Sequence, residues 1–196
     1  MRLWTIQTEE AWRTLTERGY LCCSQAVVDR DFIPACQWMA SQMITYIGHP
    51  ANGIALPLWA WYRYNNDRHQ RPDLRRSGHL PRGTRGYRIE FVIPDDDVLL
   101  SDSELWHYVL NYWYLPDSER DGATSSALHD CPPCSWSQPP RNQCVNKMIW
   151  ISWERVFDLD WSDEYVAAPR ENQSIQATFW QLDLVQVATV DSFIAR

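Results

Sequence analysis

The order of strand-like and helix-like segments constrains the fold of this chain more than any other feature of its sequence. Runs rich in β-branched and aromatic residues predict strands at residues 3–7, 56–64, 88–93, 175–182 and 187–195. Apolar residues at helical spacing predict helices over 9–18, 31–48 and 148–159, and one that begins at Ser101. Strands and helices thus follow one another in a mixed order. This order favours an α+β fold with a mixed or antiparallel sheet, flanking helices and antiparallel pairing near the C-terminus.

Capping residues support two of these helices. Thr8 precedes Glu9 and Glu10, which is typical of a helix N-terminus, and Gly19 is placed to end that helix. Ser101 and Glu104 have the spacing of a capping box, so we expect a helix to begin there.

Length and composition indicate one folded domain over residues 1–196, with a loop insertion at 117–144 that is rich in Ser, Pro, Asp and Cys. The 45% hydrophobic content is too high for a disordered chain. No apolar run reaches the roughly 18 residues of a membrane helix, and the first residues lack the pattern of a signal peptide. We therefore expect a soluble, cytoplasmic protein that does not bind membranes.

Aromatic and basic residues give the first indication of function. The chain has 12 Trp, 9 Tyr and 5 Phe, and we expect most of these rings to lie in the core. Residues 63–88, here called the arginine segment, contain eight Arg and two acids in a chain of net charge −7. Arginine binds phosphate through two parallel hydrogen bonds, so Arg71 and Arg75 are candidate phosphate contacts. The alternative is a solvated loop that pairs with the acidic remainder of the chain.

One cysteine pattern resembles a zinc site. Cys131 and Cys134 are separated by two residues, and Cys144 and His129 lie nearby, so four S and N ligands are available. Without a second pair of this spacing we do not favour zinc, and we predict no metal site.

Several blocks resemble a bacterial family of uncharacterised proteins, domain of unknown function 3841. They include LWTIQ at 3–7, PLWAWY at 57–62, RPDLR at 71–75, SWERVFDLDW at 152–161 and IQATFWQL at 175–182. The likeness extends over nearly the whole chain, but this family has no assigned activity.

The first strand, the helix capped by Thr8 and the glycine at 19 also resemble the start of ADP-ribosyltransferase-like domains of the DarT type. This resemblance implies an NAD-binding cleft. The first strand would contribute Thr5, at the position of an NAD-holding His, and Gln7. Thr178 occupies the position of the family's late-strand Glu, with Gln181 the nearest polar alternative.

Three functional hypotheses follow. The first is an NAD-dependent ADP-ribosyltransferase or NAD glycohydrolase, with Glu90 and Gln181 as candidate catalytic residues. Its co-substrate NAD would bind at Thr5, Gln7, Trp59, Tyr62, Arg71, Arg75 and Gln176. The second is a non-catalytic module that binds a nucleotide or nucleic acid in the same cleft. The third is a partner-binding protein whose aromatic residues all lie in the core. An open cleft joining Trp59, Tyr62 and Gln176 would favour the first two.

Overall fold

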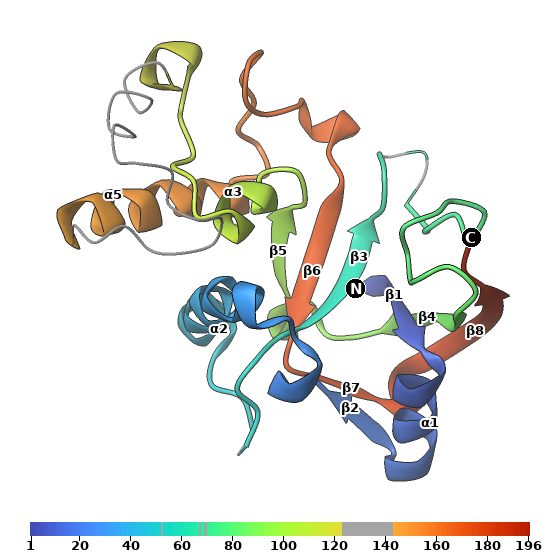
Figure 1. Cartoon of the computed structure of the whole chain (residues 1–196). Helices are drawn as coiled ribbons and strands as arrows, with labels where there is room; N and C mark the ends of the chain where they lie inside the picture. The colour runs from blue at the N-terminus through green and yellow to red at the C-terminus, as the bar shows by residue number, and fades with distance from the viewer. Residues whose placement is uncertain (52, 67, 69, 123–142) are drawn as a thin grey trace.

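The computed structural model describes residues 1–51, 53–66, 68, 70–122 and 143–196. Its main element is a six-stranded sheet in the order β5-β6-β3-β1-β4-β8 (Figure 1). The strands are β1 (Arg2–Thr8), β3 (Leu58–Arg63), β4 (Arg85–Val92), β5 (Leu99–Asp102), β6 (Ile175–Phe179) and β8 (Val187–Ile194). All pairings in this sheet are antiparallel. The predicted α+β class is therefore confirmed.

A second, two-stranded sheet pairs β2 (Tyr20–Cys22) with β7 (Gln181–Asp183). The sequence predicted one strand over 175–182, but the structure divides it at Trp180 into β6 and β7. The chain thus leaves the large sheet after Phe179 and enters the small one.

Helix α1 (Glu9–Arg18) begins and ends as predicted. The Thr8 hydroxyl accepts a hydrogen bond from the Ala11 N–H at 3.2 Å. Gly19 adopts a left-handed conformation with φ 82°, and its N–H donates to the Leu15 carbonyl at 2.9 Å. This conformation favours glycine because a Cβ would crowd the following carbonyl.

Helix α2 (Ile33–Ile47) is preceded by a 3-10 turn at Arg30–Phe32. Apolar residues at helical spacing within the predicted helix, Cys36, Met39 and Met43, are buried as that spacing implies. Phe32, however, is 43% exposed because it lies in the preceding turn. Helix α5 (Gln143–Trp153) and a 3-10 turn at Glu154–Phe157 replace the helix predicted over 148–159.

The predicted capping box at Ser101 is wrong. Ser101 is fully buried in β5, and the cap is the Asp102 carboxylate, which accepts hydrogen bonds from the N–H groups of Glu104 (2.7 Å) and Leu105 (3.0 Å). Strand pairing with β6 fixes Ser101 in the sheet, so the chain can turn only after Asp102. Helix α3 (Trp106–Leu110) follows.

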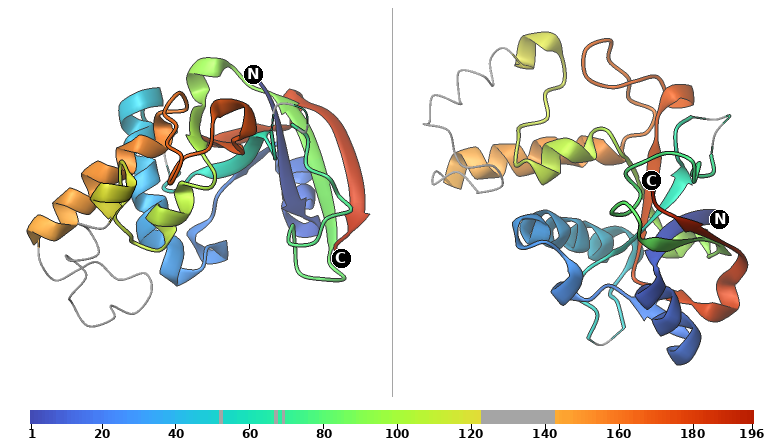
Figure 2. Two further views of the ribbon diagram at one scale, coloured as in Figure 1. Left: turned by 90° about the horizontal axis from the view of Figure 1, so that it is seen from above. Right: turned by 45° about the vertical axis from the view of Figure 1, so that its right-hand side comes forward.

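Helices α2, α3 and α5 lie beside β5 and β6, whereas α1 lies beside the small sheet near the other end of the large sheet (Figures 1 and 2). The first group encloses an aromatic core. The Trp38 ring stacks on Phe157 at 5.7 Å and meets the edge of Trp153 at 5.3 Å. The second core contains Leu3 and Leu15. The expectation that most aromatic rings lie in the core is confirmed for the rings of this cluster.

Most of the predicted insertion at 117–144 lies outside the described residues, although α5 begins within it at Gln143. Among the described residues, no helix combines the length and apolar composition that a membrane span requires.

Candidate functional site

Two arginines of the arginine segment are buried structural residues. Arg88 Nη1 donates to the Pro72 carbonyl at 2.5 Å, and Nη2 lies 2.6 Å from Asp191 Oδ2. Arg63 donates to the Arg170 carbonyl. The Arg88 contact ties the long connection between β3 and β4 to the sheet, and the Arg63 contact ties β3 to the turn that precedes β6. Neither guanidinium is therefore available to a ligand.

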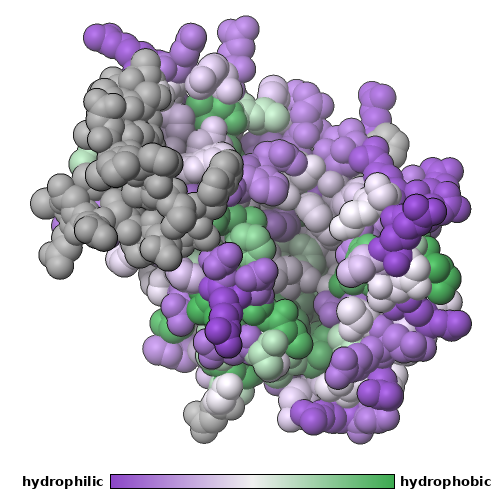
Figure 3. Space-filling view, in the orientation of Figure 1, coloured by the Kyte–Doolittle hydropathy of each residue, from purple (hydrophilic) through white to green (hydrophobic). Residues whose placement is uncertain are grey.

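Other arginines have partners at the surface. Arg75 forms a two-point contact with Asp73, with Nε–Oδ1 at 2.9 Å and Nη2–Oδ2 at 2.8 Å. Arg75 thereby lowers the pKa of Asp73 well below its usual range. The Arg76 guanidinium lies 5.9 Å from the centre of the Tyr64 ring. Figure 3 shows hydrophilic side chains over the part of the surface that this connection occupies.

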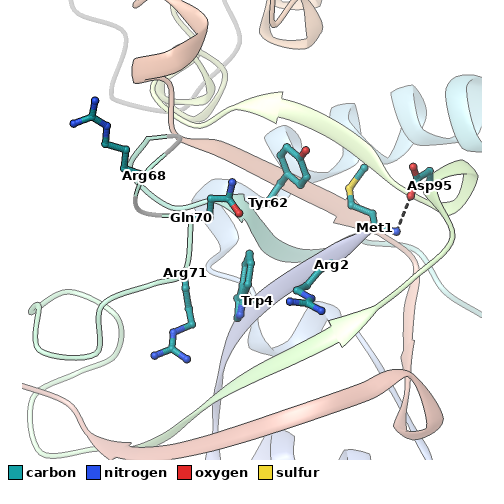
Figure 4. A pocket seen from close by; sticks show the side chains of 8 residues that line it. All are labelled: Met1, Arg2, Trp4, Tyr62, Arg68, Gln70, Arg71 and Asp95. Carbon is teal, nitrogen blue, oxygen red and sulfur yellow. Dashed lines mark ion pairs between the residues drawn. The ribbon is translucent and has the colours of Figure 1, made fainter.

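A cavity of about 700 Å³ lies where β1 begins and β3 ends. Arg2 and Trp4 come from β1, and Tyr62 comes from β3. Met1 precedes β1, and Asp95 follows β4. Arg68, Gln70 and Arg71 complete the lining (Figure 4). Trp4 and Trp61 are register partners, but β3 ends two residues later. The chain then leaves β1 and brings Arg68 and Arg71 to the cavity.

Glu90 supports two of the lining side chains. It is the register partner of Trp4, whose Nε1 donates to Glu90 Oε2 at 3.0 Å. Arg2 Nε lies 3.4 Å from Glu90 Oε1. Arg2 and Trp4 share one face of β1 because alternate residues of a strand point to the same side. Glu90 is only half-buried, whereas its neighbours on the strand, Ile89 and Phe91, are fully buried.

The cavity has a positive character. It contains three arginines against one carboxylate, Asp95, whose Oδ1 lies 2.6 Å from the Met1 ammonium group. Within the described part of the chain, the side chains of Arg68 and Arg71 form neither an ion pair nor a hydrogen bond. Both arginines are exposed. The arrangement is suited to an anionic ligand that carries a flat ring.

The structure brings only some of the predicted site residues together. Tyr62 and Arg71 line the cavity, and Glu90 contacts two lining residues. Thr5 is 2% exposed and donates to the Trp59 carbonyl at 2.8 Å. The Gln7 amide in turn donates to Thr5 Oγ1 at 2.8 Å.

The other predicted residues lie elsewhere. The Trp59 ring packs 4.8 Å from that of Trp106. Gln176 is buried and donates to Ser101 Oγ at 3.2 Å. Gln181 lies in the small sheet and donates to Asp183 at 2.6 Å. The cavity is lined by Tyr62 without Trp59 or Gln176, so it differs from the expected cleft.

Sequence reasoning missed Arg2, Trp4, Arg68 and Gln70 as lining residues. The strand predicted at 3–7 contains Trp4 but begins after Arg2, so the alternation that places both side chains on one face was only partly predictable. The proximity of Arg2 and Trp4 to Arg71 could not be predicted from the sequence, because it depends on the path of the connection between β3 and β4.

Cys131, Cys134 and His129 of the cysteine pattern that resembles a zinc site lie outside the described residues. Within the described residues there is no group of three or more potential metal ligands. Cys22, Cys23 and Cys36 are free thiols, and burial raises the pKa of Cys36 to about 11, which keeps it protonated at neutral pH.

Comparison with known proteins identifies the family of the chain but no characterised relative. Neither the curated proteins nor the solved structures gave a match. The model of the family described as a domain of unknown function, DUF3841, matches residues 2–188. This match covers more than half of the chain, which therefore belongs to the DUF3841 family.

Proposed function

We propose that the protein binds a nucleotide, NAD or a related one, in the cavity between β1 and β3. The observation that carries this proposal is the position of Arg71. Its exposed guanidinium lines a cavity that also contains Trp4 and Tyr62, and it has no ion-pair partner in the described part of the chain.

Arginine is the side chain best suited to phosphate, because its planar guanidinium forms two parallel charge-assisted hydrogen bonds. Arg68 adds a second positive charge to the same cavity. The guanidinium of Arg75 is not available to a phosphate in the same way, because its N–H groups already donate to Asp73. The geometry therefore favours Arg71 over Arg75 as the phosphate contact.

The aromatic side of the cavity supports a ligand with a flat ring. Tyr62 is half-buried, so part of its ring can contact a ligand. Trp4 is 8% exposed and is held by Glu90, so it supplies a fixed edge of the cavity. A base held between these residues would gain apolar contact while its phosphate reaches the arginines.

Calorimetric titration with NAD, ADP-ribose and AMP tests the proposal. We expect saturable binding by the wild type, and we expect Arg71→Ala to weaken it by about 10- to 150-fold, since a hydrogen bond to a charged group contributes about 1.5–3 kcal/mol. Arg75→Ala is the matched control, since Arg75 lies in the same connection but pairs with Asp73. Equal losses in the two variants, or no binding by the wild type, would contradict the proposal.

The same samples test for enzymatic activity. Glu90 contacts two lining residues and is the carboxylate with which NAD cleavage can be tested. NAD consumption that is lost in Glu90→Gln would extend the proposal to an NAD-dependent transferase or glycohydrolase. Binding without consumption would indicate a non-catalytic module. A short oligonucleotide included in the titrations tests whether nucleic acid occupies the same site.

A further inference from the structure

We propose that Glu90 acts as an internal counter-anion that the ligand must displace from Arg2. The site would therefore favour a doubly charged terminal phosphate over a singly charged phosphodiester. This inference rests on the proposed nucleotide binding and narrows the ligand to nucleotides with a terminal phosphate, such as AMP, over NAD and ADP-ribose, whose phosphates are diesters.

Glu90 depends on Arg2 for its charge neutralisation. Its side chain is 17% exposed, and its contacts are Trp4 Nε1 at 3.0 Å, Arg2 Nε at 3.4 Å and Thr189 Oγ1 at 3.4 Å. Arg2 is the one cation that contacts Glu90 within the described part of the chain. A carboxylate that is only partly open to water is stabilised by a nearby positive charge.

Arg2 is available to a ligand as well as to Glu90. Its side chain is 65% exposed and lines the cavity, and it lies close to Trp4 in the close-up view (Figure 4). Because the Arg2 partner is mostly exposed, its ion pair with Glu90 contributes little free energy, and a stronger anion can replace the carboxylate. The long arginine side chain can turn toward the cavity while Trp4 remains bonded to Glu90.

The charge of the phosphate decides whether this exchange is favourable. A singly charged phosphodiester offers Arg2 the same charge as Glu90 and leaves Glu90 without its cation. A terminal phosphate carries about −1.5 to −2 at pH 7 and interacts with Arg2 and Arg71 together, so its attraction exceeds that of the carboxylate. Because every ligand must displace Glu90 from Arg2, Glu90 lowers the affinity for phosphates in general and leaves the doubly charged phosphate as the group that binds most tightly.

A different role for Glu90 predicts the opposite result. If Glu90 only held Arg2 in position for the ligand, removal of its charge would weaken binding of every phosphate. Glu90→Gln keeps an oxygen that can accept from Trp4 Nε1 but cannot form the ion pair with Arg2. This variant therefore separates competition from positioning.

The test compares AMP with cyclic 3′,5′-AMP, which share the base but differ in phosphate charge and in the free 3′-hydroxyl. The effect of Glu90→Gln on each compound isolates the contribution of the charge. Calorimetric titrations at pH 7.5 use the wild type, Glu90→Gln, Arg2→Ala and the double variant. Glu9→Gln is the matched control, because Glu9 also pairs with an arginine, Arg85 at 3.7 Å, but does not line the cavity. Thermal unfolding of each variant establishes that it is folded.

We expect the wild type to bind AMP about tenfold more tightly than cyclic AMP, and Glu90→Gln to bind cyclic AMP up to about fivefold more tightly than the wild type, so that the preference narrows. In the Arg2→Ala background, the Glu90→Gln substitution should have little effect. Weaker binding by Glu90→Gln, or an unchanged preference, overturns the inference while nucleotide binding stands. A wild type that binds neither compound overturns both.

Discussion

Arg88 on β4 and Asp191 on β8 are register partners and form an ion pair of 2.6 Å between Nη2 and Oδ2. The Arg88 side chain is 7% exposed, whereas that of Asp191 is 47% exposed. Because Arg88 also donates to the Pro72 carbonyl, one guanidinium joins two strands to the connection that carries Arg68 and Arg71. Arg88 therefore positions the arginine segment without binding a ligand itself.

Replacement of Arg88 should lower stability. We expect Arg88→Ala to reduce the free energy of unfolding by about 1–3 kcal/mol, because two charge-assisted hydrogen bonds are lost. Arg75→Ala removes a pair in which Arg75 is 81% exposed, so it should change stability by less than about 0.5 kcal/mol. Urea denaturation of both variants measures the difference, and equal effects would show that Arg88 has no special structural role.

A conservative change at Arg71 separates charge from geometry. Arg71→Lys keeps the positive charge in the cavity but loses the planar guanidinium, so we expect nucleotide affinity between those of the wild type and Arg71→Ala. Titration with AMP measures the three affinities. Full recovery by lysine would indicate that only charge matters at this position.

The Asp102 cap makes stability depend on pH. Burial raises the pKa of Asp102 above its ordinary value of 3.8, so the folded chain binds this proton more readily than the unfolded chain. The contribution of Asp102 to stability therefore falls as the pH rises from 3.8 through the raised pKa.

Asp102→Asn keeps an oxygen acceptor for the cap but has no proton to release. The wild type should thus lose stability relative to this variant as the pH rises above 3.8, which denaturation at several pH values measures. Asp29→Asn is the control, because Asp29 is an exposed cap that accepts from the Asp31 N–H at 3.1 Å. A wild type that gains stability relative to Asp102→Asn as the pH rises would contradict the argument.

The end of α1 should tolerate asparagine better than alanine. Gly19 has φ 82°, and no atom outside Gly19 and its two chain neighbours lies within 4 Å of the place that a Cβ would occupy. The cost of Gly19→Ala is therefore conformational, about 1–2 kcal/mol. Gly19→Asn should cost less, because asparagine adopts the left-handed region more readily. Thermal unfolding of the two variants checks this order.

The sequence by itself determined the elements whose signals are local. The Thr8 cap and Gly19 bound α1 because both act through hydrogen bonds within a few residues. The β-branched and aromatic residues within 88–93 predicted most of β4, because strand propensity is also a local property. The side of β4 on which Glu90 lies also followed from alternation along the strand.

Tertiary structure decided what depended on pairing between distant segments. Pairing with β6 placed Ser101 inside β5 and moved the cap to Asp102, against the local capping pattern. Register between β1 and β4 placed Glu90 opposite Trp4 and within reach of Arg2. The eight arginines look alike in sequence, but buried acceptors fixed Arg63 and Arg88, while the path of the connection left Arg71 at the cavity. Interactions between residues close in sequence determine the helices and strands. The candidate site depends on contacts between residues far apart in sequence, and no short stretch of sequence specifies the geometry of those contacts.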